Sequence, residues 1–261
     1  MSELAISLVA FACIFGGTML GMIVRTFLPE HHLSDESTDA VKLGAGTIAT
    51  MAALVLGLLI ASAKGSFDTM SSEIRKVGSR IILLDREMSH YGTETKGARD
   101  LLRRYGACTI EQMWPEDKIG PVVAKVCEAG GDIEAVQEKL RQLSPRTDAQ
   151  RWLQSRALQV SGEIAEARWL LIAQIGQKSI PMPFLVMLVS WLTIIFTSFG
   201  LVSPRNPTVI AIFLVCAFSA ACALFLILEL DSPYEGLLKV SSAPMRNALT
   251  HLDGIATGTP Q

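Results

Sequence analysis

The sequence predicts an all-α polytopic membrane protein with four transmembrane helices and a cytoplasmic helical bundle. Half of the residues are hydrophobic, the mean hydropathy is +0.38, and 18% of residues are charged. Such a chain is too apolar for an ordinary soluble domain and too charged to lie wholly in lipid. The expected parts are residues 1–63 (transmembrane helices 1 and 2), 64–180 (a cytoplasmic helical domain), 181–229 (transmembrane helices 3 and 4) and 230–261 (a cytoplasmic tail).

Four uncharged runs, each of about 20 residues, are long enough to cross a bilayer as helices. They are Leu4–Val24, Leu43–Ala63, Pro183–Val202 and Thr208–Leu228. The first run has no basic residue before it, which argues against a signal peptide. It contains the GxxxG pair Gly17 and Gly21, which allows close helix approach and which we interpret as packing.

The second run continues into a polar region without a stop signal, since no proline follows Ala63 before Pro115. Apolar residues then recur at alternating spacings of three and four, which is typical of a helix packed lengthwise against partners. These residues are Phe67, Met70, Ile74, Val77, Ile81, Leu84, Met88 and Tyr91. The sequence therefore predicts one helix that begins in the membrane and ends in water.

The rest of the cytoplasmic segment predicts further helices. They are Lys96–Met113, which Pro115 ends, a piece from Pro121 to Leu143 interrupted by Gly130-Gly131, and Asp148–Gln177. The last carries a second apolar seam at Leu153, Ala157, Val160, Ile164, Ala167 and Leu171. We expect the two seams to pair antiparallel within one chain. The alternative places one seam between subunits, and apolar Ile82 and Leu83 beside the first seam favour such an assembly.

The basic residues indicate the topology. Proline-rich Ser203–Pro207 makes the last two spans an antiparallel hairpin, so both termini and residues 64–180 share one side. All of the 23 Lys and Arg residues except Arg25, Lys42 and Arg205 lie on that side. Because loops rich in Lys and Arg stay in the cytoplasm, the sequence predicts that both termini and residues 64–180 are cytoplasmic.

Metal, thiol and catalytic chemistry have little support. The loop containing His31 and His32 is interpreted as solvated, with Ser34 or Asp35 as the N-cap of the next helix, and a divalent-ion site as the alternative. Cys108 and Cys127 lack a CxxC motif, so incidental thiols are favoured over a disulfide or zinc. No nucleotide, hydrolase or metalloprotease motif occurs and the charges are mixed, so neither catalytic residues nor a nucleic-acid site are predicted.

The second span carries the candidate functional surface. Small residues recur on one helical face: Gly46, Thr50, Ala53, Gly57 and Ala61. In lipid this stripe would forfeit dispersion contacts, so it is expected to meet a neighbouring helix or a water-filled path. As a pore lining, Thr50 would supply a hydroxyl, and Leu54 or Leu58 would supply a hydrophobic gate.

The end of the fourth span offers a candidate cytoplasmic mouth. Glu229, Asp231 and Glu235 form a carboxylate cluster that could concentrate cations. The alternative is structural, because Ser232, Pro233 and Glu235 fit the N-cap, N1 and N3 positions of a capping box that starts a surface helix.

Two stretches carry a family resemblance. Leu33–Ser37 through Ala52–Lys64 resembles the first signature of a bacterial family described as a bestrophin-like domain of unknown function. Leu230–Gly236, followed by Val240–Met245, resembles its second. The resemblance covers the whole chain and implies distant kinship with the bestrophin anion channels, which are pentamers whose second helix lines the pore. The consecutive aspartates of the bestrophin calcium clasp are absent, so calcium gating is not expected.

These observations together predict an oligomeric ion channel of a bacterial inner membrane, with the second transmembrane helix lining the pore. The expected partners are the lipid bilayer, inorganic ions and further copies of the chain, most simply in a tetramer or pentamer, with no cofactor and no nucleic acid. The rival interpretation is a non-conducting scaffold or regulatory protein that binds a cytoplasmic partner. No span contains a charged residue, and a transporter is therefore disfavoured.

Overall fold

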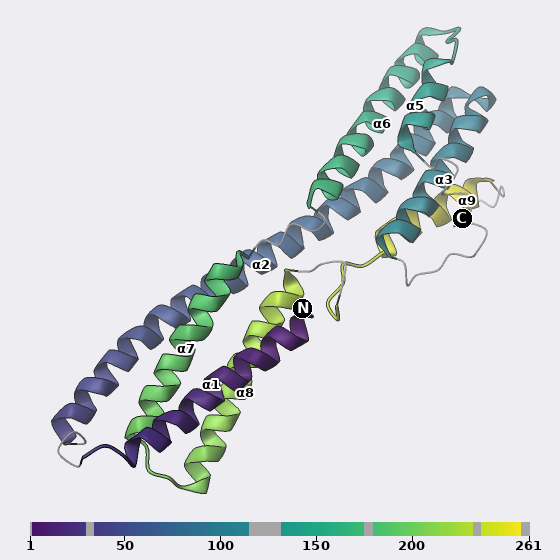
Figure 1. The fold of residues 1–261 in the computed structure, drawn as a ribbon. Coiled ribbons are helices and arrows are strands. Elements are labelled where there is room, and N and C mark those ends of the chain that lie inside the picture. The colour runs from purple at the N-terminus through teal and green to yellow at the C-terminus, as the bar shows by residue number, and fades with distance from the viewer. Residues whose placement is uncertain (1, 30–33, 115–131, 175–179, 232–235, 257–261) are drawn as a thin grey trace. The chain divides into compact units, whose positions relative to one another are not determined.

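The computed structural model describes residues 2–29, 34–114, 132–174, 180–231 and 236–256, and all regular structure within these ranges is helical (Figure 1). The chain divides into two compact units. We call Met1–Phe67 with Lys178–Leu238 the membrane unit, and Asp68–Gln177 with Lys239–Gln261 the helical unit. The all-α prediction is confirmed.

The membrane unit contains the predicted spans. They lie in α1 (Glu3–Arg25), the first part of α2 (Asp35–Tyr91), α7 (Met182–Val202) and α8 (Pro207–Leu230). Among the described residues, these four helices are long and apolar enough to cross a membrane. The helix α2 is continuous over its 57 residues, as the absence of proline and the unbroken seam predict. It begins where expected, with the amide of Ser37 donating to Oγ of Ser34 at 3.4 Å.

Glycines set how closely α1 approaches α7. A β-carbon placed on Gly17 would lie 2.7 Å from Oγ1 of Thr197 and 3.0 Å from Cγ2 of Thr193. One placed on Gly21 would overlap the carbonyl oxygen of Thr197, and one on Gly200 would overlap that of Thr18. The predicted packing role of the GxxxG pair is confirmed, because only glycine permits this separation of the two backbones.

Apolar side chains from all four helices form the core of the membrane unit. Its buried members are Ala10, Ala52, Leu59, Ala63, Ile180, Leu185, Leu188, Ile195, Leu224, Ile227 and Leu228. Two arginines form hydrogen bonds that join the C-terminal end of α1 to the end of α7 and to the loop after it. Nη1 of Arg25 donates to the carbonyl of Val202 at 2.7 Å, and Nη2 of Arg205 donates to that of Met22 at 2.9 Å.

The helical unit is built around the remainder of α2. Its other elements are the short 3-10 helix η2 (Thr93–Thr95) and the helices α3 (Lys96–Met113), α5 (Ile133–Arg141), α6 (Asp148–Gln174) and α9 (Ala243–Ala256). Met70 to Tyr91 of the first predicted seam are buried, and so are Ala157 to Leu171 of the second.

The helices α2 and α6 run antiparallel, which confirms the predicted pairing of the two seams within one chain. Nε2 of Gln150 donates to the carbonyl of Tyr91 at 3.2 Å, and Arg80 pairs with Glu163 at 3.1 Å. Beside the seam, Ile82 is half-buried and Leu83 is exposed, at 36%. The alternative that places one seam between subunits therefore stays a prediction.

The helix α9 was not predicted from the sequence. This helix packs on α3, with the backbone at Pro244 against Gly78 of α2 and Nη2 of Arg103 donating to the carbonyl of Leu252 at 2.8 Å. The capping box expected at Ser232, Pro233 and Glu235 lies outside the described residues. One cysteine interpretation was wrong, because Cys108 is disulfide-bonded.

Candidate functional site

The membrane part of α2 has two sides of different character. Its buried side carries Ala45, Ala52, Leu59 and Ala63, which pack into the core of the membrane unit. The predicted small face lies on the opposite side. Thr50, Ala53, Gly57 and Ala61 are exposed, and Gly46 is half-buried.

The small face has no cover from its own chain among the described residues. No atom lies within 4 Å of a β-carbon built on Gly46 or on Gly57. Gly17, Gly21 and Gly200 of the same unit have backbone or side chains at that distance. Gly46 and Gly57 of the small face therefore do not serve close packing against the described part of the chain, which leaves this face for a second copy, lipid or water.

Large apolar residues flank the small face. Leu54 is 76% exposed and Leu58 is 69% exposed, and both follow the stripe by one position along the helix. Bulky leucines recover dispersion contacts in lipid or against another helix, whereas a stripe of glycine and alanine does not. The exposed side of α2 thus carries small side chains along the stripe and large apolar side chains beside it.

Thr50 is the hydroxyl-bearing member of the small face. Its Oγ1 donates to the carbonyl of Thr47 at 2.7 Å, and Oγ1 of Thr47 donates to that of Leu43 at 2.9 Å. Hydroxyls bonded to their own helix need no partner from a neighbouring one. An exposed threonine at this position is therefore compatible with either lipid or water.

The two described carboxylates of the predicted mouth are buried. Glu229 is 4% exposed, and its Oε2 accepts the amides of Leu237 at 2.6 Å and Leu238 at 3.3 Å. Asp231 is 7% exposed, and its Oδ2 accepts the amide of Ile180 at 3.4 Å. These contacts favour a role in fixing the chain after α8 over a role at a mouth. Glu235 lies outside the described residues.

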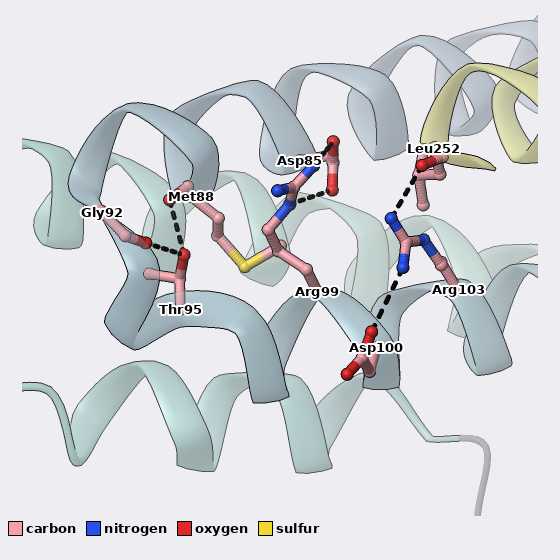
Figure 2. Close-up of polar contacts among 8 residues, drawn as sticks. All are labelled: Asp85, Met88, Gly92, Thr95, Arg99, Asp100, Arg103 and Leu252. Atoms are coloured by element: carbon pink, nitrogen blue, oxygen red, sulfur yellow. Dashed lines mark hydrogen bonds and ion pairs between the residues drawn. The ribbon is translucent and has the colours of Figure 1, made fainter. Parts of the chain in front are cut away.

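An ion pair that the sequence analysis missed lies in the helical unit (Figure 2). Arg99 of α3 donates through Nε and Nη2 to the two carboxylate oxygens of Asp85 at 2.7 and 2.8 Å. Asp85 is 1% exposed. The hydrogen bond to this carboxylate raises the pKa of Arg99, so the guanidinium keeps its positive charge. The available signal was a carboxylate directly after Leu84 of the apolar seam.

The alternative of a divalent-ion site at His31 and His32 stays a prediction, because both residues lie outside the described residues. Within the part of the chain that the structure describes, no three His, Cys, Asp or Glu side chains are grouped as metal ligands.

A protein-family model matches most of the chain. The family model described as "Bestrophin-like domain" matches residues 12–245. The chain belongs to the bestrophin-like family. Both resembling stretches described above, at Leu33–Lys64 and Leu230–Met245, fall within the matched range. No curated protein matches the sequence significantly.

Solved structures share the bestrophin-like fold at low sequence identity. A substituted bacterial Bestrophin homologue from Klebsiella pneumoniae has a TM-score of 0.64 at 11% identity, covering 94% of this chain and 98% of that chain. A second substituted form from that organism has a TM-score of 0.59 at 13% identity, covering 97% and 99%. A structure described as a membrane protein has a TM-score of 0.63 at 12% identity, also covering 97% and 99%. These likenesses establish the fold.

Proposed function

We propose that this bestrophin-like chain forms a homo-oligomeric ion channel whose pore is lined by the small face of α2. The observation that carries the proposal is that Thr50, Ala53, Gly57 and Ala61 are exposed and face away from the core of their own unit. Membership of a family named for channels supports conduction. A face that its own chain leaves uncovered is the one available for a shared axis.

The proposed assembly is a closed ring, a tetramer or pentamer, in which each copy contributes one α2. Small residues leave room for water along the axis, and the hydroxyl of Thr50 gives it a polar contact. Leu54 and Leu58 form the hydrophobic constriction, which closes the path by excluding water. The buried carboxylates Glu229 and Asp231 have no part in this scheme.

A non-conducting scaffold is the second candidate, since the same exposed side of α2 could serve only as a contact between copies. The two functions predict different effects of a substitution at Ala53. A large side chain there would block a water-filled path, but it would disturb a helix contact without any electrical signal.

Conduction by purified protein in planar bilayers tests the channel. Leu54→Ala should raise open probability about tenfold or more, because it removes the constriction. Ala53→Trp should abolish current by occupying the path. The matched controls are Leu20→Ala on α1 and Ala211→Trp on α8, both exposed in the membrane unit. They should leave the current unchanged. Silence of wild type and Leu54→Ala alike, or equal effects of test and control variants, would contradict a pore along α2.

We further propose that both termini and the helical unit are cytoplasmic, on the strength of the charge asymmetry. Single reporter cysteines at His32→Cys and Ser89→Cys, with the exposed Cys13, Cys216 and Cys222 replaced by serine, test this in intact cells. An impermeant maleimide should label position 32 and leave 89 unlabelled until the cells are opened. Ser89 is preferred to Cys108 as a site because Ser89 is exposed, whereas Cys108 is buried and disulfide-bonded. Labelling of 89 alone in intact cells would reverse the topology.

A further inference from the structure

A cavity lies inside the helical unit, between α2, α3, α6 and α9, and its volume is about 90 Å³. Most of its described lining residues are apolar, among them Ile74 of α2, Met113 of α3 and Met245 of α9. Tyr105 and Thr109 of α3 are among the polar ones. Channel function as proposed above assigns no role to this cavity.

The size and polarity of the cavity limit what can occupy it. A single water needs about 10–15 Å³, whereas a cavity of roughly 150 Å³ takes up benzene. By proportion, this cavity has room for about four non-hydrogen atoms. An ordered water needs two to four polar partners, which the apolar part of the wall does not offer. An occupant with an apolar body is therefore favoured over a cluster of waters.

The polar end of the cavity is formed by two hydroxyls of α3. Oγ1 of Thr109 donates to the carbonyl of Tyr105 at 2.8 Å, so this oxygen can only accept a further hydrogen bond. Tyr105 is 1% exposed, and burial raises the pKa of its phenol, so its hydroxyl keeps its proton at neutral pH. A hydrogen bond with the Thr109 hydroxyl lowers this pKa in part, which places the two groups side by side. The cavity thus presents a donor next to an acceptor.

The cation that lines the cavity, Arg168 of α6, already has anionic partners. Its Nη1 donates to Oδ1 of Asp132 at 2.9 Å and lies 3.9 Å from Oε2 of Glu134. The guanidinium therefore does not require a carboxylate from an occupant, and an anionic occupant would be repelled by Asp132 and Glu134. These charges favour a neutral molecule.

We infer that this cavity binds a short-chain alcohol, a neutral molecule with one hydroxyl on an alkyl body of about three carbons. The hydroxyl of the alcohol lies between Tyr105 and Thr109, where it accepts from the phenol and donates to Oγ1 of Thr109. An unbroken chain of hydrogen bonds then ends at the carbonyl of Tyr105. The alkyl body contacts the apolar wall at Ile74, Met113 and Met245. A ketone of the same size accepts from Tyr105 but has no proton for Thr109.

Methyl NMR of the full chain in detergent, with isotope-labelled methionine, tests the inference with isopropanol and acetone as probes of matched size. Isopropanol should shift the methyl resonances of Met113 and Met245 saturably, with a dissociation constant of the order of millimolar, since so few atoms contact the wall. Acetone should bind about fivefold more weakly, because it makes one hydrogen bond fewer. Met88 is the internal control, since it is buried in the same unit but does not line the cavity. Its resonance should not follow this saturation.

Thr109→Val removes the accepting oxygen with little change of shape. It should bring the affinity for isopropanol to within about twofold of that for acetone, because neither probe then has a partner for a donated proton. Thr250→Val is the matched control. Oγ1 of Thr250 donates to the carbonyl of Arg246 at 3.0 Å in the same way, but Thr250 does not line the cavity. This variant should keep the wild-type preference for the alcohol.

Tyr105→Phe is a second variant, which keeps the test independent of how well Thr109→Val folds. It should weaken both probes about fivefold and keep their ratio, because each loses the same donor. Isopropanol giving no saturable shift at Met113 and Met245, equal affinity of the wild type for the two probes, or equal effects of Thr109→Val and Thr250→Val would overturn the inference. None of these readouts involves current, so failure of the channel proposal would leave this test intact.

Discussion

Replacing Arg99 with methionine should destabilise the helical unit by about 3–5 kcal/mol, because it leaves the carboxylate of Asp85 buried without a counterion. Asp85 is 1% exposed, whereas the side chain of Arg99 is 19% exposed and can reach water. Asp85→Asn should therefore cost less than Arg99→Met. The double variant Asp85→Leu with Arg99→Met should recover much of the loss, since removing both charges leaves none unpaired.

Thermal unfolding of the solubilised protein, followed by circular dichroism, measures this effect. Arg99→Met should lower the melting temperature by on the order of 10 °C. Lys76→Met is the control, because it breaks the exposed pair with Glu73 at 2.7 Å, a type of pair that contributes about 0.5 kcal/mol or less. Similar shifts for Arg99→Met and Lys76→Met would show that the buried pair contributes no more than a surface one.

Alanine at Gly21 or Gly200 should destabilise the membrane unit by about 2–3 kcal/mol or more. At both positions the new β-carbon would meet backbone of the opposite helix, at Thr197 for Gly21 and at Thr18 for Gly200. Backbone cannot change rotamer to make room, so α1 and α7 must separate and lose contacts along their length.

Gly16→Ala is the matched control on α1. No atom lies within 4 Å of a β-carbon at Gly16, so alanine there should be neutral or stabilising, by up to about 1 kcal/mol from helix propensity. The fraction of protein that stays monodisperse in detergent after stepwise heating measures both effects. If Gly200→Ala and Gly16→Ala behaved alike, α1 and α7 would have to be more loosely packed than these distances indicate.

The helices were predictable from the sequence because their signals are local. Uncharged length identified α1, α7 and α8, and the seam from Met70 to Tyr91 identified the polar half of α2. Pro115 marked the end of α3 correctly, at Met113. Periodicity also gave the antiparallel pairing of α2 with α6, since two seams of the same period can cover each other along their length.

The polar contacts were not predictable because their partners lie far apart along the chain. Nothing local joins Glu229 to the amides of Leu237 and Leu238, and a cluster of carboxylates before a proline suggests a solvated mouth equally well. The helix α9 begins at Ala243, further along the chain than the cap expected at Ser232. The carbonyl of Ser242 accepts the amides of Met245 and Arg246 at the true start of the helix.

The exposed side of α2 shows that a stripe of small residues does not by itself indicate whether the stripe is buried or exposed. Sequence pattern finds a stripe of small residues, but the same stripe at Gly17 and Gly21 is buried against α7, whereas at Gly46 and Gly57 it is open. Only the arrangement of the neighbouring helices separates the two cases, because close approach and open space require the same residue types.

The hydroxyl hydrogen of Thr50 is already engaged in a hydrogen bond to the carbonyl of Thr47. Toward anything that passes along this face it can therefore offer only oxygen lone pairs. Lone pairs replace part of the hydration shell of a cation, while a halide or other anion requires a hydrogen-bond donor. In the proposed pore, an anion would keep its own water past Thr50, and a cation could shed some of it there. Discrimination against cations would then have to arise away from this ring of threonines.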